Sequence, residues 1–224
     1  PYQFMMQHPD FAATDLSRLQ TAGVGGAPCA EAILTGWLDR GVPLVQGWGM
    51  TETSPGGTML EATDALRKLG SAGKCLLHTE VKVVDDEGAE LPWGEVGELL
   101  IRGPNITPGY WNNAEATAKS FVDGWLKTGD LGYLDEDGYL YIVDRKKALI
   151  IRGGENISCL EVENALDKHP EIIESCVCGI EDQKFGEIVG AYIFCSSKVT
   201  EDELKAFLKG KIADYKIPEK IKFS

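Results

Sequence analysis

The stretch Gly124-Trp125-Leu126-Lys127-Thr128-Gly129-Asp130, with the Asp144-Arg145-Lys146-Lys147 that follows it, decides the fold of this chain. Residues 131–143 between the two predict a β-hairpin, because strand-like runs flank the turn Asp135-Glu136-Asp137-Gly138. A hairpin returns its second strand beside its first, so Asp130 and Arg145 are expected near each other at its open end. A carboxylate and a guanidinium there can bind a polyhydroxyl or phosphate ligand. The alternative is a surface salt bridge that only closes the hairpin.

Upstream of this stretch, the pattern is that of an α/β unit. A weak helix is predicted over residues 11–19, and a short strand over 19–26 runs into glycines. A helix is predicted over 30–38, then a buried strand over 42–45 and a glycine turn at Gly47. In such an alternation the loops at the carboxyl ends of the strands are expected to bind ligands.

Downstream, the apolar pattern changes twice. Strands predicted over residues 79–84 and 96–101 form a β-rich subdomain with the central hairpin, and a short helix is predicted over 113–121. After Lys147 the prediction is a compact α+β unit. Its elements are a strand over 148–152, a helix over 160–168, strands over 172–180 and 189–196, and a last helix with a capping box of Thr200 and Glu203.

The predicted fold class is therefore α/β and α+β, in two parts. Residues 1–144 are expected to combine the α/β region with the β-rich subdomain, and residues 148–224 are expected to form the compact α+β unit. Both ends of the sequence are consistent with a piece of a longer protein.

The amino-acid composition argues against a membrane-spanning, a secreted and a nucleic-acid-binding protein. The 224 residues are 43% hydrophobic and 25% charged, as in ordinary globular proteins. No apolar run approaches the length of a membrane span, no signal peptide is visible, and a net charge of -13 argues against a nucleic-acid partner. Six cysteines show no CxxC pair, so reduced thiols and a cytoplasmic location are expected.

Four stretches, in this order, resemble the adenylate-forming superfamily of acyl-CoA synthetases, luciferases and peptide-synthetase adenylation domains. They are Gly25-Gly26-Ala27-Pro28, Gly47-Trp48-Gly49-Met50-Thr51-Glu52, residues 125–130 and residues 144–163; Gly109-Tyr110-Trp111-Asn112 also fits. The resemblance implies an AMP-forming acid–thiol ligase that uses ATP, Mg²⁺ and CoA. It implies a carboxylic acid substrate, expected to be a medium- or long-chain fatty acid. A homo-oligomer is compatible with it.

The resemblance also implies roles for individual residues. Adenine would lie against the turn at residues 26–28, Asp130 would accept from both ribose hydroxyls with help from Arg145, and Glu52 would hold Mg²⁺. Residues 1–144 would be the carboxyl-terminal part of the large AMP-binding domain, and residues 148–224 a small, mobile carboxyl-terminal domain that is truncated. Residues 145–147 would be the hinge between them, with Lys147 as the hinge residue, and the loop at Gly153 and Gly154 would face the CoA side. The residues implied to bind ATP or AMP are Gly26, Ala27, Pro28, Gln46, Gly47, Trp48, Gly49, Met50, Thr51, Asp130 and Arg145.

Taken singly, each motif also has a plainer interpretation. The turn at residues 25–28 can simply open a helix, Glu52 can belong to an ordinary polar loop, Lys147 to a solvated basic pair, and the glycine pair to a tight turn. By resemblance, short-chain members place a bulky side chain at the position of Gly49, so a pocket not limited to acetate is expected.

Two parts of the family pattern are not found in residues 1–224. These are the glycine-rich phosphate loop with its lysine and the catalytic lysine near the family's carboxyl terminus, so no catalytic lysine is assigned and the 224 residues alone are expected not to turn over. Two alternatives stay open: a peptide-synthetase adenylation domain, and a catalytically inactive nucleotide-binding fragment. Release of pyrophosphate with a panel of carboxylic acids would distinguish an enzyme from such a fragment.

Overall fold

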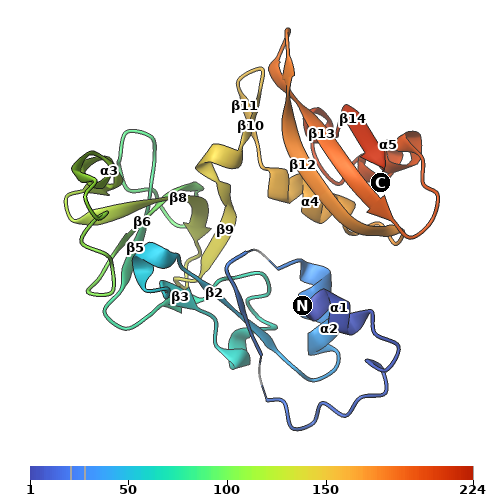
Figure 1. Ribbon diagram of the computed structural model, residues 1–224, viewed down its shortest axis with the longest axis horizontal. Coiled ribbons are helices and arrows are strands. Elements are labelled where there is room, and N and C mark those ends of the chain that lie inside the picture. Colours follow the sequence, from blue (N-terminus) through green and yellow to red (C-terminus); the bar gives the residue numbers. More distant parts are fainter. Residues whose placement is uncertain (21, 28, 224) are drawn as a thin grey trace. The chain divides into compact units, whose positions relative to one another are not determined.

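The computed structural model describes residues 1–20, 22–27 and 29–223 (Figure 1). The chain forms two compact units, Pro1–Ile142 and Val143–Ser224. Within the described residues, no helix is both long and apolar enough to cross a lipid bilayer.

The first sheet of the amino-terminal unit is built on a parallel pair of strands. β1 (Ala22–Gly25) and β2 (Leu44–Trp48) are parallel, and the sheet continues through β3 (Thr58–Met59) and β4 (Lys74–Cys75). Helix α2 (Glu31–Leu38) connects the parallel strands and buries Leu34 and Trp37 in the same apolar cluster as Leu44. The α/β prediction is confirmed, but β2 runs through Gly47, which therefore lies within a strand and not in a turn.

The helix predicted over residues 11–19 is wrong, since this segment consists of turns and the only helix of this region in the described residues is α1 (Tyr2–Met6). The ring of Phe11 packs edge-on against Trp37, with centroids 5.1 Å apart. The guanidinium of Arg40 donates to the carbonyl oxygens of Phe11 and Thr14. Tertiary hydrogen bonds thus satisfy backbone groups that a helix would have satisfied internally.

The second sheet contains the predicted hairpin. Its order is β5 (Glu80–Val84), β6 (Gly97–Arg102), β8 (Trp125–Leu134) and β7 (Phe121–Val122), and β9 (Leu140–Arg145) also pairs with β8. Both hairpin strands are present, and β8 begins at Trp125, earlier than the predicted start at residue 131, because residues 125–130 continue the same strand. Helix α3 (Ala114–Ser120) begins after Asn113, whose side chain accepts a hydrogen bond from Ala116 N.

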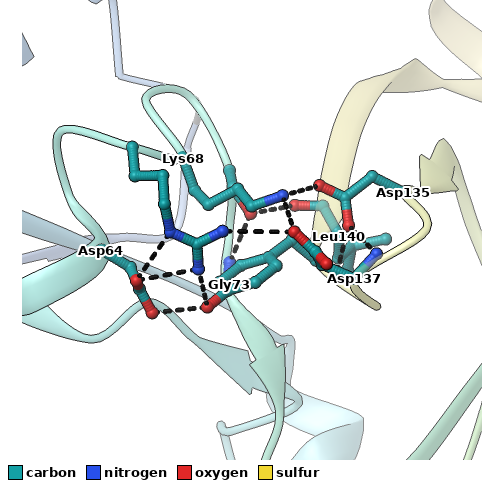
Figure 2. Close-up of polar contacts among 9 residues, drawn as sticks. Asp64, Lys68, Gly73, Asp135, Asp137 and Leu140 are labelled. Carbon is teal, nitrogen blue, oxygen red and sulfur yellow. Dashed lines mark hydrogen bonds and ion pairs between the residues drawn. The ribbon is translucent and has the colours of Figure 1, made fainter.

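Ion pairs hold the turn of the hairpin against the segment that precedes β4 (Figure 2). The ammonium of Lys68 lies 2.7 Å from carboxylate oxygens of both Asp135 and Asp137. The hydrogen bond to Asp135 is the largest cause of the raised pKa of Lys68. The backbone N of Leu140 also donates to the carbonyl of Gly73 at 2.9 Å. The hairpin that carries Asp130 is therefore anchored to the first sheet at its turn.

The carboxyl-terminal unit is a sheet with two helices. Its strands are β10 (Ile150–Arg152), β11 (Glu155–Ile157), β12 (Ile172–Asp182), β13 (Gly186–Cys195) and β14 (Lys220–Phe223), in the order β11-β10-β13-β12 with β14 parallel to β13. Helices α4 (Cys159–Leu166) and α5 (Glu201–Leu208) contribute buried leucines and a valine to the same core as β12 and β13. The predicted capping box of Thr200 and Glu203 is confirmed. Short 3-10 turns occur at Lys146–Ala148 and Asp214–Lys216.

Two carboxylates of the α4 region cap the edge strand β12. The carboxylate of Glu163 accepts from the backbone N of Val177 at 2.8 Å, and that of Asp167 accepts from the Ser175 hydroxyl at 2.7 Å. Desolvation raises the pKa of both carboxyl groups. Since an uncovered strand edge can pair with another chain, these contacts protect the edge.

We expect Glu163→Gln to leave the unfolding free energy at neutral pH unchanged or raised, because the amide keeps an acceptor for Val177 and removes a half-buried charge. Because the folded-state pKa of Glu163 is raised, the native wild type binds a proton more tightly than the unfolded chain. The wild type should therefore gain stability relative to the variant as the pH falls through that pKa. Glu163→Ala should be about 1 kcal/mol less stable than Glu163→Gln at all pH values, since neither variant titrates and only in the alanine variant does Val177 N lose its partner. Urea denaturation at pH 4 to 8 measures the unfolding free energies of wild type and both variants. A Gln variant less stable than wild type at neutral pH would contradict the prediction.

Candidate functional site

The candidate site begins at the carboxyl ends of the parallel strands. Gly25 pairs with Gly47, and a Cβ at Gly25 would approach the Gly47 carbonyl oxygen to 2.9 Å, so the two backbones meet where only glycine fits. Gly26, at φ +83°, and Ala27 follow directly after β1. The predicted site residue Pro28 lies outside the described residues. The sequence-predicted turn and the end of β2 are thus side by side.

The loop after β2 folds tightly on itself. Thr51–Thr53 is a 3-10 turn, and the hydroxyl of Thr53 accepts from the backbone N of Met50 at 2.9 Å. A Cβ on Gly49 would lie 1.7 Å from the carbonyl oxygen of Pro55. A Cβ at position 49 would therefore meet backbone and not open space, and the acyl pocket that is not limited to acetate stays a prediction. Glycine is required here by the loop's own backbone.

A buried hydrogen bond joins two motifs that are far apart in the sequence. The indole Nε1 of Trp48, at the end of β2, donates to Asp130 Oδ2 at 2.8 Å. Trp48 and Asp130 are 8% and 5% exposed. The hydroxyl of Thr128 accepts from the backbone N of Asp130 and donates to the Leu99 carbonyl, which fixes the local strand geometry. The nucleotide residues predicted from two separate stretches therefore belong to one place in the amino-terminal unit.

Gln46, another residue predicted to bind the nucleotide, makes its side-chain hydrogen bond within the fold. Its side chain is buried, and its amide nitrogen donates to the Ser71 carbonyl at 3.1 Å. Ser71 in turn donates through its hydroxyl to the Leu140 carbonyl. The side chain of Gln46 thus connects β2 to the segment that holds the hairpin, and a contact of this residue with nucleotide stays a prediction.

Glu52, the predicted metal ligand, is half-buried in the 3-10 turn. Its Oε1 accepts from the phenol of Tyr110 at 2.7 Å, and its carbonyl oxygen accepts from Thr107 N at 2.8 Å. The hydrogen bond to Glu52 is the largest cause of the raised pKa of Tyr110. Among the described residues no group of three or more His, Cys, Asp or Glu could hold a metal. One carboxylate beside a phosphate-bearing substrate fits Mg²⁺, which takes few protein ligands and keeps several waters.

The segment at residues 103–110 supports this loop, a role that was not predicted from the sequence. The side-chain nitrogen of Asn105 donates to the carbonyls of Thr53 and Gly56, at 2.8 and 2.7 Å. The backbone carbonyl oxygen of Asn105 accepts from the Ser54 hydroxyl. The resemblance of Gly109-Tyr110-Trp111-Asn112 to the family was the signal that could have pointed here.

The remaining predicted residues belong to the carboxyl-terminal unit. Arg145 ends β9, and Lys147 is exposed in the 3-10 turn that follows. Gly153 and Gly154, at φ +60° and +95°, form the two-residue turn between β10 and β11. The predicted proximity of Arg145 to Asp130 joins residues of different units and stays a prediction.

Asp144 has a structural role at the start of this unit. Its Oδ2 accepts from the Ser158 hydroxyl at 2.7 Å and from Leu160 N at 3.3 Å, so it caps the beginning of α4. Desolvation raises the pKa of the neighbouring Cys159 to about 12, and this thiol donates to the Ala148 carbonyl. Cys159 is therefore a protonated structural residue and not a nucleophile.

Comparison with known proteins gives a consistent result. Residues 2–111 match the family model described as AMP-binding enzyme, and residues 161–224 match that of the AMP-binding enzyme C-terminal domain. A feruloyl-CoA synthase from Amycolatopsis sp. is 41% identical over 225 residues, which is 100% of this chain and 46% of the relative. The chain thus spans about half the length of the curated relatives it matches.

Solved structures agree in fold. The o-succinylbenzoate CoA synthetase of Bacillus subtilis, in complex with its acyl-adenylate intermediate, superposes with a TM-score of 0.86 at 42% identity, over 92% of this chain and 42% of that one. The same enzyme has also been solved with ATP and a magnesium ion. An amide bond synthetase from Marinactinospora thermotolerans superposes with a TM-score of 0.91 at 33% identity, over 100% of this chain and 46% of that one.

Proposed function

Because this chain belongs to the adenylate-forming family of AMP-binding enzymes, we propose that the protein joins a carboxylic acid to CoA through an acyl-adenylate. The main support for this proposal is the hydrogen bond between Trp48 and Asp130. It joins the two predicted nucleotide-binding stretches, residues 47–52 and 125–130, beside the carboxyl ends of the parallel strands. In the first step a carboxylate oxygen attacks the α-phosphorus of ATP, and pyrophosphate leaves. In the second step the CoA thiol attacks the acyl carbon and AMP leaves, while the thiol proton passes to solvent.

The residues described above have distinct roles in this proposal. Gly26 and Ala27 leave a flat backbone surface for adenine, Asp130 accepts from the ribose hydroxyls, and Thr51 contacts the phosphates. Glu52 would hold Mg²⁺, which supplies charge neutralisation on the phosphates when bound. The contribution of the described residues is thus to position the nucleotide, which lowers the barrier by orienting the reacting groups.

We propose an aromatic acid as substrate in place of the fatty acid expected from the sequence. Support comes from the names of relatives, which are ligases for feruloyl and 2-succinylbenzoate groups.

The test uses the protein purified from its complete natural gene, with ATP, Mg²⁺, CoA and matched acids: ferulate, 2-succinylbenzoate, benzoate, octanoate and palmitate. Pyrophosphate release that depends on the acid, with aromatic acids used faster, is the expected result. Faster use of octanoate or palmitate would overturn the aromatic assignment. Nucleotide binding without pyrophosphate release from any acid would support a non-catalytic module.

The likeness to an amide bond synthetase favours a second candidate, in which an amine and not CoA accepts the acyl group. The first step is shared, so pyrophosphate release does not distinguish the two. Product analysis by mass spectrometry does, since CoA gives a thioester and a supplied primary amine gives an amide.

We also propose Lys147 as the pivot between the two half-reactions. It lies in the exposed turn Lys146–Ala148 near the start of the second unit, where a change of a few dihedral angles would reorient everything that follows. Proline fixes φ near -65°, so Lys147→Pro should spare acyl-adenylate formation and slow thioester formation at least about tenfold. Single-turnover measurements of each step check this, and equal loss in both steps would count against a pivot.

A further inference from the structure

We infer that Tyr110 is a positioning residue for the metal ligand Glu52, an inference that rests on the proposed function. The phenol of Tyr110 donates to Glu52 Oε1 at 2.7 Å. Within the described part of the chain, this is the one hydrogen bond that the Glu52 carboxylate accepts. A carboxylate held through one oxygen keeps a fixed plane and presents its other oxygen, Oε2, in a fixed direction. Partners of this kind orient metal ligands and raise the affinity of the site.

Both ends of this hydrogen bond are themselves held in place. The backbone of Tyr110 is held just before α3, because its N donates to the Thr117 hydroxyl at 2.9 Å and its carbonyl accepts from Asn113 N. The backbone of Glu52 is fixed because its carbonyl accepts from Thr107 N at 2.8 Å. The phenol therefore approaches the carboxylate from one direction and needs no rearrangement to hold it.

The fold of the loop does not depend on this phenol. Asn105 holds the loop by its backbone carbonyls, and the Thr53 hydroxyl closes the 3-10 turn from within. Tyr110 is 39% exposed, so removal of its hydroxyl leaves no buried cavity. Tyr110→Phe should accordingly change the orientation of the Glu52 carboxylate and leave the stability of the protein within about 0.5 kcal/mol of wild type.

The experiment titrates Mn²⁺, as a probe of the Mg²⁺ site, into the full-length protein saturated with ATP, and reads bound metal by electron paramagnetic resonance. Tyr110→Phe is expected to raise the half-saturating Mn²⁺ concentration about 10- to 100-fold. The Mg²⁺ concentration for half-maximal pyrophosphate release should rise in parallel. The matched control is Tyr141→Phe, which removes a phenol that makes no hydrogen bond within the described residues and should change neither value.

A second comparison separates positioning from general damage. In a Glu52→Gln background, which already lacks the charged ligand, Tyr110→Phe should have no further effect on metal affinity. An additive effect there, or unchanged metal affinity in Tyr110→Phe alone, would overturn the inference. If wild type itself shows no ATP-dependent metal binding, the proposed function fails instead, so the two failures are distinguishable.

Discussion

Replacing Asp130 by alanine is expected to weaken AMP binding at least about 100-fold, because each hydrogen bond to a charged acceptor contributes about 1.5–3 kcal/mol and the ribose offers two. The carboxylate is 5% exposed and already accepts from Trp48 Nε1, so it is held in one orientation before the nucleotide arrives. Its loss removes both the ribose acceptor and the partner of the indole. Calorimetric titration with AMP measures the effect directly.

Trp48→Phe is the control for this experiment. Phenylalanine keeps an aromatic ring at the end of β2, but it deletes the N–H group that donates to Asp130 together with part of the buried indole ring. The expected loss is about tenfold, since one hydrogen bond to a charged group is removed and the ribose acceptor stays. AMP binding by Asp130→Ala at wild-type affinity would show that the ribose lies elsewhere.

Gly49→Ala is expected to destabilise the amino-terminal unit by about 3 kcal/mol or more, at the upper end of the range for overpacked sites. The new Cβ would lie 1.7 Å from the carbonyl oxygen of Pro55, so the backbone of the loop must move. The loop carries Thr51 and Glu52, and ATP binding should therefore fall together with stability. Urea denaturation and ATP titration measure the two effects.

Gly23→Ala is the matched control, because a Cβ at Gly23 meets nothing within 4 Å and its φ is not positive. It should leave the unfolding free energy within about 0.5 kcal/mol of wild type, since alanine also reduces the entropy of the unfolded chain. A Gly49→Ala protein as stable as Gly23→Ala would mean that the loop relaxes without cost. A larger residue at position 49 would then be compatible with a pocket there.

Much of the secondary structure could be predicted from the sequence because the residues that specify each element lie within or next to it. The hairpin followed from two strand-like runs around an acidic turn, and the last helix followed from Thr200 and Glu203. The α/β beginning followed from glycines after two short apolar runs, and the parallel pairing of Gly25 with Gly47 agrees with it. Such signals lie within a few residues of the element they specify, so no distant contact is needed to interpret them.

Local patterns failed where distant groups satisfy the backbone. Residues 11–19 form turns and not a helix, and the guanidinium of Arg40 donates to the carbonyl oxygens of Phe11 and Thr14 within them. The small size of Gly49 suggested open space, yet the obstacle is the Pro55 carbonyl, a backbone group whose position depends on the folded loop. Side-chain spacing carries no information about such an obstacle.

By itself, the sequence determined that the chain belongs to the family of AMP-binding enzymes and predicted which residues bind the nucleotide, since their motifs have a characteristic order and residue types. Only the tertiary structure decided how they are held. Trp48 meets Asp130, and Glu52 meets Tyr110, across long stretches of chain. The physical reason is that side-chain hydrogen bonds require a distance near 3 Å and a direction, and both are set by the packing of whole strands and loops.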